Sequence, residues 1–426
     1  MPTKIAFLGL GNIGSGVFNL LKENGFTIKH KVDVEFQVKY ALVRDLGKQR
    51  SVTLGDTIIT DNIDDILGDR EVTIVAEFLG GIHPATDYME KCLRAGKSIV
   101  TANKEALANS WHTLEDAAKD NNVGLYYEAS VGGGIPIIST VINSMQANNV
   151  STVMGIINGT TNYILSKMSD DGKDYQDVLK TAQSKGLAEP DPTSDVEGTD
   201  AASKLCILAS LAFHTKIPLS FIHCEGISKV SAIDIEYGKE LDYTLKLLAI
   251  AKKDGMKVEA RVHPTFIDND HPLAGVKGSY NAIFIHGDAV GDLMLYGRGA
   301  GDMPTASAII SDMVVAATTE SHVHTTFNNA QMGSSTLDFD DNWLTRFYIR
   351  IEVSDKSGVL ASMTSILAKH EVSIESLVQK SYGTQIVPVV FVTHLTKERN
   401  MMRALSEIEA LNSVIGVKGL IRVETE

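Results

Sequence analysis

The 426-residue sequence predicts an α/β protein of several domains, and three observations support this prediction. A strand, a glycine-rich turn and a helix follow one another within residues 4–21, and strand-like and helical runs then alternate as far as residue 127. From about residue 150 the pattern changes and indicates a second, mixed sheet. Residues 346–426 then follow the order strand, helix, strand, strand, helix, strand.

Composition limits the possible functions. The chain is 44% hydrophobic and 22% charged, as globular proteins are, and it is long enough for more than one core. Its net charge of −14 argues against a nucleic-acid partner or an anionic membrane, because like charges repel. No apolar run approaches the roughly 18 residues of a membrane span, and the N-terminus does not read as a signal peptide. We therefore expect a cytoplasmic protein with no nucleic-acid or membrane partner.

The first expected element is a dinucleotide-binding turn. The apolar strand Lys4–Leu8 runs into a G-x-G-x-x-G sequence at residues 9–14, and Val17–Leu21 has helical spacing. In such a turn the first glycine permits the tight bend, the second lets the backbone approach a pyrophosphate, and the third allows close helix packing. The candidate cofactor-binding residues are Gly9, Gly11, Asn12, Ile13 and Gly14. The alternative is a glycine-rich turn that binds no nucleotide.

The residue after the second expected strand, Val34–Val43, bears on the choice of cofactor. NAD-selective enzymes usually place an acid there, whereas an arginine can hold the 2′-phosphate of NADP. Arg44 occupies this position and favours NADP, although the adjacent Asp45 leaves NAD open.

Further strands and helices are expected to complete a mostly parallel sheet. The expected strands are Val72–Ala76, Ser98–Val100 and Leu125–Tyr127, and the expected helices are His83–Arg94 and a segment from Lys104 to about Asn121. Ligands of such sheets bind beyond the carboxyl ends of the strands. Lys104 closely follows a strand and should lie at that edge, although a lysine that opens a helix is often simply exposed.

Two polar loops follow this sheet. Glu128–Pro136 contains three consecutive glycines, which allow carbonyl oxygens to turn inward beside one acid and coordinate a hard cation. Alternatively, it is only a loop before a helix at Ile137–Met145. After a strand at Val153–Ile157, the turn Asn158–Asn162 either lines a substrate pocket or caps the next helix.

The stretch Ala182–Lys204, after a helix at Tyr175–Lys185, contains five carboxylates and two prolines. The prolines exclude a helix until the segment from about Val196 to Phe213. Asp200 and Lys204 stand four residues apart there and share one face. A lysine beside buried surface suits proton transfer, and an acid suits the ammonium group of a small zwitterionic substrate. An exposed ion pair within the helix is the simpler alternative.

The rest of the chain is expected to complete the mixed sheet and then to form a third domain. A glycine-rich turn at residues 297–305 precedes a helix, and Gly301 in this turn lies at a second possible anion site. Residues 321–345 should be a linker. The expected strands are Lys257–His263, Ala282–Gly287, Asp292–Tyr296, Phe347–Val353, Val372–Gln379, Ile386–Thr393 and Val414–Val423, and the expected helices are Ala306–Thr318, Val359–Lys369 and Lys397–Leu411.

Several motifs together resemble one enzyme family. The acid-rich stretch carries Gly186, Glu189, Asp191-Pro192, Asp195, Gly198, Asp200 and Lys204 at the spacing of the homoserine dehydrogenase signature. The sequences TANK at residues 101–104 and NGTTN at residues 158–162 also match, so the resemblance covers essentially the whole chain. The D-x-x-G-V-L sequence at residues 355–360 resembles the first turn of an ACT domain.

The resemblance implies a domain plan and a reaction. Residues 1–130, with a return helix at about 304–320, would form a Rossmann-like nucleotide-binding domain. Residues 131–303 would form an α+β catalytic and dimerisation domain with a mixed sheet, and residues 346–426 an ACT domain. The implied reaction interconverts L-homoserine and L-aspartate 4-semialdehyde with NADP or NAD, in threonine, methionine and isoleucine biosynthesis. A homodimer or homotetramer is expected.

The resemblance also implies roles for individual residues. Glu189 would hold the substrate amino group, Asp200 would contact the hydroxyl region, and Lys204 would transfer the hydroxyl proton. Lys104 would orient substrate and cofactor, and Asp195 would hold a water or Lys204 itself. Gly186 and Gly301 would join the cofactor site, and main-chain carbonyls of Glu128, Val131, Gly133 and Ile135 would hold a structural sodium ion.

The ACT domain would bind an amino-acid effector such as threonine, or would serve assembly alone. Two other functions stay open. One is another ACT-containing NAD(P)-dependent dehydrogenase, although such enzymes place the glycine turn far inside the chain, whereas here it begins at Gly9. The other is a non-enzymatic module that senses nucleotide and amino acid, for which the acid-rich stretch would have no purpose.

Overall fold

The computed structural model describes residues 2–50, 52–320, 322, 337–380 and 385–424. The chain divides into two compact units. The first comprises Met1–Val153, Ser203–Leu219 and Asn281–Thr336, and the second comprises Met154–Ala202, Ser220–Tyr280 and Leu337–Glu426. The α/β class expected from the sequence is confirmed. No helix in the described part of the chain is long and apolar enough to cross a membrane.

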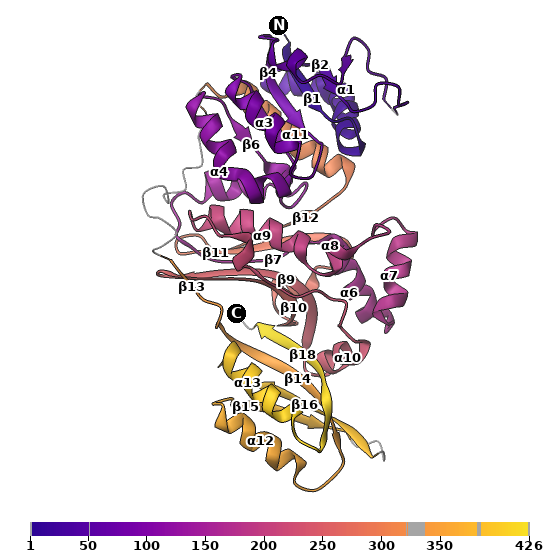
Figure 1. Cartoon of the computed structure of the whole chain (residues 1–426), viewed down its shortest axis with the longest axis vertical. Helices are drawn as coiled ribbons and strands as arrows, with labels where there is room; N and C mark the ends of the chain where they lie inside the picture. The colour runs from indigo at the N-terminus through magenta and orange to yellow at the C-terminus, as the bar shows by residue number, and fades with distance from the viewer. Residues whose placement is uncertain (1, 51, 321, 323–336, 381–384, 425–426) are drawn as a thin grey trace. The chain divides into compact units, whose positions relative to one another are not determined.

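The first unit is organised around a six-stranded parallel sheet with the order β3-β2-β1-β4-β5-β6 (Figure 1). The order reverses between β1 and β4, which is the switch point where sheets of this kind bind nucleotides. Its strands are β1 (Thr3–Leu8), β2 (Phe36–Leu42), β3 (Ile58–Thr60), β4 (Val72–Glu77), β5 (Ser98–Thr101) and β6 (Leu125–Tyr126). Other elements of this unit are α1 (Asn12–Val32), α2 (Asp64–Leu67), α3 (Ala85–Arg94), α4 (Lys104–Asp120), a 3-10 turn (Glu128–Ser130), α5 (Ile137–Ser139), β11 (Tyr280–Gly287), β12 (Gly291–Arg298) and α11 (Asp302–Thr318).

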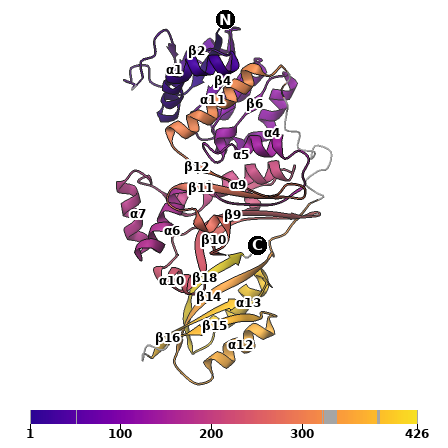
Figure 2. The ribbon, with the colours of Figure 1, turned by 180° about the vertical axis from the view of Figure 1, so that it is seen from behind.

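Alternating side chains of β1 explain why helices cover both faces of this sheet. Ile5 and Phe7 are fully buried in a cluster that includes residues of α1 and α11. Ala6 and Leu8 point the other way and are buried with residues of α3 and α4. A parallel strand covered on both faces is apolar at every position, which is why Lys4–Leu8 reads as an uninterrupted apolar run after its lysine. Figure 2 shows α11 in front of the sheet, and Figure 1, viewed from the opposite side, shows α3 in front of it.

The single α-helix predicted after Pro136 is interrupted. The short helix α5 is followed by a π-helical turn at Thr140–Ser144. The Thr140 hydroxyl donates a 2.6 Å hydrogen bond to the Pro136 carbonyl, which competes with the helical amide for that acceptor. The Met145 N–H then bonds to the carbonyl of Thr140, five residues back.

The second unit begins with a helical group and a long hairpin. The strands β9 and β10 pair antiparallel along their whole length, and β8 pairs in parallel with β10. The boundary between the units falls inside β7 and inside α9. The elements up to residue 280 are β7 (Val150–Ile156), α6 (Gly159–Asp171), α7 (Tyr175–Ser184), α8 (Thr193–Val196), α9 (Thr199–Ala212), two 3-10 turns (Leu219–Phe221 and Pro272–Gly275), β8 (His223–Cys224), α10 (Ala232–Glu240), β9 (Tyr243–Asp254) and β10 (Lys257–Asp268).

The helix predicted from about Val196 to Phe213 is present as α9, which begins at Thr199 and ends at Ala212. A short helix, α8, precedes it at Thr193–Val196, where the prolines were predicted to exclude one, and the two helices are separated at Gly198. Gly198 has a φ of +82°, and a Cβ there would lie 3.1 Å from the Cys224 sulfur. The backbone at this joint therefore requires glycine. Asp200 and Lys204 still stand one turn apart, now near the start of α9.

The C-terminal part of the second unit has the predicted order of strands and helices. The strand β14 lies between β16 and β18 and runs antiparallel to both, while α12 and α13 share one core against this sheet (Figure 2). In addition, β18 pairs in parallel with β10, with Arg422 opposite Thr265. The elements are β14 (Leu344–Ser354), α12 (Val359–Lys369), β15 (Ile374–Gln379), β16 (Ile386–Thr393), β17 (Thr396–Lys397), α13 (Glu398–Glu409) and β18 (Val414–Glu424).

Much of the linker predicted at residues 321–345, namely 321 and 323–336, lies outside the described residues. The part that is described includes a short strand, β13 (Asp338–Phe339), which pairs in parallel with Lys257 and Val258 of β10. The end of the predicted linker is therefore regular structure. Two residues are too few for the sequence pattern to indicate a strand.

Candidate functional site

The glycine-rich turn between β1 and α1 has a tightly constrained backbone. Gly9 has a φ of +102°, and its N–H donates a 2.9 Å hydrogen bond to the Leu42 carbonyl of β2. A Cβ on Gly14 would lie 2.8 Å from the Gly9 carbonyl oxygen, so α1 packs directly on the end of β1. A Cβ on Gly11 would meet nothing within 4 Å. Gly11 therefore presents open backbone at a helix N-terminus, as a pyrophosphate site requires.

A second glycine-rich turn lies against the first. Gly301 precedes α11 with a φ of +119°, and a Cβ on Gly16 of α1 would lie 3.4 Å from the Asp302 carbonyl oxygen. The first turns of α1 and α11 are thus neighbours. Two helix N-termini at one edge concentrate partial positive charge, which favours an anionic group.

The loop after β2 carries Arg44 at the carboxyl edge of the sheet, where its side chain is exposed. The Arg50 guanidinium donates hydrogen bonds to the Asp45 carbonyl at 2.5 Å and to the Lys48 carbonyl at 2.7 Å. These bonds fold the loop onto itself just beyond Arg44. The arginine is therefore in the region where a dinucleotide fold holds the adenosine ribose.

Lys104 opens α4 immediately beyond the carboxyl end of β5. A buried network organises this edge: the Thr101 hydroxyl donates to Glu77 at 2.6 Å, and Asn103 caps α4 by accepting from the Ala106 N–H at 3.0 Å. The Asn103 amide also donates to the Gly81 carbonyl at 2.7 Å. Together these bonds fix the two loops after β4 and β5 in which Lys104 lies.

Glu77 is a buried carboxyl that the sequence analysis did not single out. It accepts from the N–H groups of Leu79 at 2.6 Å and Gly80 at 3.2 Å. Burial raises the pKa of Glu77, and these hydrogen bonds together with that from Thr101 oppose the rise. The available signal was an acid at the end of an otherwise apolar strand, where a carboxyl can organise the following loop.

The three-glycine loop surrounds another buried carboxyl, Glu128. Its two oxygens accept from the N–H groups of Ile138 at 2.8 Å and Ser139 at 2.7 Å, so the side chain holds the start of the interrupted helix. Burial raises the pKa of Glu128 against these bonds. The backbone turns at Gly132 and Gly133, with φ values of +76° and +56°. These turns give the loop the curled backbone that an inward-facing set of carbonyls needs.

Asp312 of α11 accepts a 2.8 Å hydrogen bond from the Glu128 N–H. Burial raises the pKa of Asp312 to about 8, the bond from Glu128 opposes this rise, and the negative charge of Glu128 adds to it. The Asp312 carboxyl therefore holds its proton to a higher pH than an ordinary aspartate does. No feature of the sequence distinguishes this aspartate, because its surroundings come from segments more than 180 residues apart.

In the second unit, Asn158 joins the acid-rich stretch to the end of β7. Its side-chain nitrogen donates to Asp195 at 2.7 Å and to Asp200 at 2.9 Å, and its side-chain oxygen accepts from the Thr161 N–H at 2.9 Å. Asn158 is therefore the cap of α6 that the sequence predicts as one alternative. It also fixes two carboxylates of the predicted site beside each other.

The loop that carries Glu189 is held by side chains on both sides. The Thr160 hydroxyl donates to the Leu187 carbonyl at 2.8 Å, and the Gln183 amide donates to the carbonyls of Glu189 and Pro190, each at 3.2 Å. Glu189 itself is exposed. Its backbone is thus fixed while its carboxylate is accessible to a ligand.

The predicted site residues fall into two groups. Glu189, Asp195 and Asp200 belong to the second unit, and Asn158 brings the two aspartates together. Lys204 lies one turn after Asp200 on α9 and is partly exposed. The residues predicted at the cofactor, apart from Gly186, belong to the first unit, as do Lys104 and the carbonyls predicted to hold sodium. Gly186 lies just beyond the end of α7 and has a φ of +68°.

Comparison with known families accounts for most of the chain. The model described as the NAD-binding domain of homoserine dehydrogenase matches residues 9–128, and the homoserine dehydrogenase model matches residues 136–314. The ACT domain model matches residues 347–412.

Relatives match along the whole length. The homoserine dehydrogenase of Bacillus subtilis (strain 168) is 39% identical over 99% of this chain and 98% of its own. The crystal structure of a homoserine dehydrogenase from Thiobacillus denitrificans has a TM-score of 0.90 at 38% identity and covers 100% of this chain and 99% of its own. A hyperthermophilic archaeal homoserine dehydrogenase in complex with NADPH has a TM-score of 0.63 at 26% identity, over 74% of this chain and 98% of its own.

The doubly wound sheet, its glycine-rich turn and the matched models define a dehydrogenase that binds a nicotinamide dinucleotide and carries an ACT domain. More narrowly, the chain belongs to the homoserine dehydrogenase family. Its reaction is the interconversion of L-homoserine and L-aspartate 4-semialdehyde, in threonine, methionine and isoleucine biosynthesis. The comparisons give no support to the two alternative functions, a different ACT-containing dehydrogenase and a non-enzymatic sensor.

Proposed function

We propose that this chain performs the reaction with NADP in preference to NAD, and that the acid-rich stretch binds the substrate. The observation that carries this proposal is Asn158, which holds Asp195 and Asp200 together one turn before Lys204. Two carboxylates and their shared donor thus meet at the start of the helix that carries Lys204. Such a cluster can bind a zwitterion and transfer a proton.

In the proposed mechanism the carboxylate of Glu189 binds the substrate ammonium group, and Asp200 binds the region of its hydroxyl. The Lys204 amine accepts the hydroxyl proton during oxidation and returns it during reduction. Asp195 holds Lys204 or a water in position. The nicotinamide of the bound cofactor supplies the hydride acceptor or donor. Lys104, at the start of α4, orients substrate and cofactor.

The cofactor would bind across the glycine-rich edge of the first unit. Gly9, Gly11, Asn12, Ile13 and Gly14 would hold the pyrophosphate, with Gly301 beside them at the start of α11 and Gly186 completing the set. Arg44 supports the preference for NADP, because a guanidinium binds a phosphate with two hydrogen bonds. The archaeal relative in complex with NADPH is consistent with this preference.

We further propose a structural sodium ion at the three-glycine loop, held by the carbonyls of Glu128, Val131, Gly133 and Ile135. The positive φ values of Gly132 and Gly133 support this assignment, because they curl the loop. The Ile135 carbonyl also accepts from the Ile137 N–H at 2.7 Å, and its second lone pair is left for an ion. Replacing sodium chloride by tetramethylammonium chloride at equal ionic strength should lower the Tm; an unchanged Tm would argue against the ion.

Two further proposals concern regulation and assembly. The ACT domain, residues 346–426 in our domain plan, would respond to an amino acid such as threonine. The protein would be a homodimer or homotetramer. Exposed apolar side chains on β12 and directly before it support self-association: Met294 of β12 is 39% exposed, Tyr296 of β12 is 54% exposed, and Val290, next to the start of β12, is 52% exposed. Light scattering of the purified protein would distinguish monomer, dimer and tetramer.

The direct test of the proposed function is reduction of NADP and, separately, NAD by L-homoserine, followed at 340 nm in the wild type and in Arg44→Ser. We expect both cofactors to support turnover and NADP to have the higher kcat/KM. In Arg44→Ser this preference should fall by about tenfold or more, because a charged hydrogen bond to phosphate is lost. An unchanged ratio would remove Arg44 from the proposal without affecting the reaction.

A further inference from the structure

Lys246 of β9 is a buried lysine to which the proposed mechanism assigns no role. Its side chain is 2% exposed, and its ammonium group donates to two neutral oxygens, the side-chain oxygen of Asn162 at 3.3 Å and the Val276 carbonyl. Burial lowers the pKa of Lys246 to about 8; the charge of Lys277 adds to this fall, and the charge of Asp170 opposes it. A buried ammonium group with neutral partners costs free energy of folding, so its hydrogen bonds indicate what it contributes.

The first of these partners, Asn162, lies in the first turn of α6 and is the last residue of the turn 158–162. Its side-chain nitrogen donates to the Tyr280 carbonyl at 3.0 Å and to the Val276 carbonyl at 3.3 Å. Its side-chain oxygen accepts from Lys246. The Asn162 amide is therefore held at both ends, and loss of the ammonium group would leave its buried oxygen without this donor.

The helical turn that Asn162 anchors also carries Asn158. The Asn162 N–H donates to the Asn158 carbonyl at 3.3 Å, and the Thr161 N–H donates to the Asn158 side-chain oxygen at 2.9 Å. The position of Asn158 therefore follows the first turn of α6. Its side-chain nitrogen is the donor shared by Asp195 and Asp200. A shift of this turn would thus lengthen one or both of those bonds.

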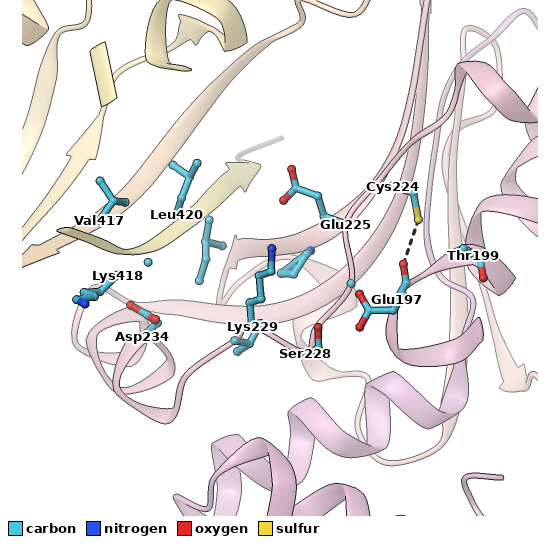
Figure 3. Close-up of a pocket in the computed structure, with 15 residues that line it drawn as sticks. Glu197, Thr199, Cys224, Glu225, Ser228, Lys229, Asp234, Val417, Lys418 and Leu420 are labelled. Carbon is cyan, nitrogen blue, oxygen red and sulfur yellow. Dashed lines mark hydrogen bonds between the residues drawn. The ribbon is translucent and has the colours of Figure 1, made fainter. Parts of the chain in front are cut away.

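The joint between α8 and α9, which lies between the two aspartates in the chain, has a separate support. The Ile227 N–H donates to the Val196 carbonyl at 2.7 Å, and the Cys224 thiol donates to the Glu197 carbonyl at 3.3 Å. Figure 3 shows the thiol contact at a pocket that residues of both segments line. These bonds hold the backbone of the joint independently of the Lys246 contact. Loss of that contact should therefore disturb the shared donor and leave the joint in place.

We propose that Lys246 is a positioning residue for the reaction: through Asn162 it anchors the first turn of α6, and so it holds the Asn158 amide between the two aspartates. This inference rests on the proposed role of the acid-rich stretch in substrate binding. It adds a residue of the mixed sheet that acts through hydrogen bonds and not by contact with the substrate. Its loss should affect the substrate reaction and leave cofactor binding unchanged.

The test uses the full-length protein, with steady-state oxidation of L-homoserine and calorimetric titration with NADPH. Lys246→Met keeps much of the side-chain volume and lacks the donor, so kcat/KM for homoserine should fall by about tenfold or more through misplacement of the aspartates. The Kd for NADPH should not change. Lys252→Met is the matched control, because Lys252 lies on the same strand and pairs with Glu424 of β18 at 2.7 Å. It should keep the wild-type kcat/KM whatever its effect on Tm.

A double-mutant cycle separates positioning from a general loss of structure. In Asn158→Ser the amide that Lys246 positions is already absent, so adding Lys246→Met should cause little further loss of kcat/KM. A lysine that merely stabilises the fold would cause the same fold-loss in both backgrounds. The Tm of each variant shows whether it is folded. If Lys246→Met does not fold, Asn162→Ser takes its place in the cycle, because the serine side chain ends one bond short of the Asn162 oxygen.

Three results would overturn the proposal. The first is a wild-type kcat/KM for homoserine in the folded variant that lacks the contact. The second is an equal fold-loss with and without Asn158→Ser, which would mean that Lys246 acts by another route. The third is a loss of kcat/KM in Lys252→Met as large as that in Lys246→Met. Turnover by the wild type and the loss in Asn158→Ser alone report on the proposed function, so failure of one does not imply failure of the other.

Discussion

The glycine-rich edge of the first unit and the acid-rich stretch differ in the groups that they offer to a ligand. At the glycine-rich edge, the proposed binding groups are backbone amides, and a Cβ on Gly14 would lie 2.8 Å from the Gly9 carbonyl oxygen. In the acid-rich stretch, the proposed binding groups are side chains, and Asn158 joins two of them, Asp195 and Asp200, across 37 and 42 residues of sequence. The first region should therefore respond to added volume, and the second to altered charge.

The largest expected effect is in the acid-rich region. Lys204→Met preserves much of the side-chain volume but removes the proton acceptor, so kcat should fall by about 10²–10⁴-fold, the usual contribution of general acid–base catalysis. The KM for NADP should change little. Steady-state kinetics of homoserine oxidation would measure both. Lys185→Met is the matched control, because Lys185 of the same stretch donates to the Tyr163 hydroxyl at 3.1 Å, and it should retain nearly full activity.

The next effect tests the assembly of the carboxylates. Asn158→Asp keeps an acceptor for the Thr161 N–H but sets a third carboxylate against Asp195 and Asp200, which should lower kcat/KM by about 10²-fold through repulsion and misplacement. Asn158→Ser keeps the cap and lacks the repulsion, so its loss should be smaller. Equal activity in Asn158→Asp and the wild type would mean that the two aspartates do not act together.

At the glycine-rich edge, two substitutions of the same size should separate folding from binding. Gly14→Ala forces a Cβ against the Gly9 carbonyl and should lower the free energy of unfolding by about 1–3 kcal/mol, measured by urea denaturation. Gly11→Ala meets nothing within 4 Å and should unfold as the wild type does, but it should weaken NADPH binding in a fluorescence titration. Wild-type NADPH affinity in Gly11→Ala would contradict the proposed pyrophosphate position.

The remaining effect is a pH dependence of stability and concerns Asp312, whose pKa burial raises to about 8. An acid with a raised pKa in the folded state stabilises the protein below its unfolded pKa, near 4, and this contribution is lost as pH rises to about 8, by at most about 1.4 kcal/mol per pH unit. Asp312→Asn lacks this loss. Its Tm relative to the wild type should therefore increase between pH 5 and pH 8 and then level off. A Tm difference between Asp312→Asn and the wild type that stays constant from pH 5 to pH 8 would mean that Asp312 is ionised throughout that range.

The two regions also differ in how much the sequence could predict. The glycine-rich turn is local: strand, glycines and helix occupy adjacent residues, and the fold class followed from such patterns. The strand Tyr243–Asp254 went unassigned, because its Leu, Ala and Lys residues favour helix and only pairing with β10 makes it a strand. The break at Gly198 depends on contact with Cys224, which no local pattern reveals.

The candidate site shows the same limit. The acid-rich stretch and Lys104 could be named from motifs, whereas the bridging role of Asn158 and the buried carboxyls Glu77 and Asp312 depend on contacts between distant segments. Local sequence thus indicates which groups are able to bind a ligand or transfer a proton. The fold decides which of them meet and which are buried.

The central claim is that the glycine-rich edge binds the cofactor and the acid-rich stretch performs the substrate chemistry. Its most direct test compares wild type and Asp200→Asn in two measurements, calorimetric titration with NADPH and steady-state oxidation of L-homoserine. The substitution keeps an oxygen that can accept from Asn158 and removes the charge. We predict an unchanged Kd for NADPH together with a fall in kcat/KM for homoserine of at least about tenfold. Unchanged turnover, or a loss of NADPH affinity equal to the loss of turnover, would contradict the assignment of substrate chemistry to the acid-rich stretch.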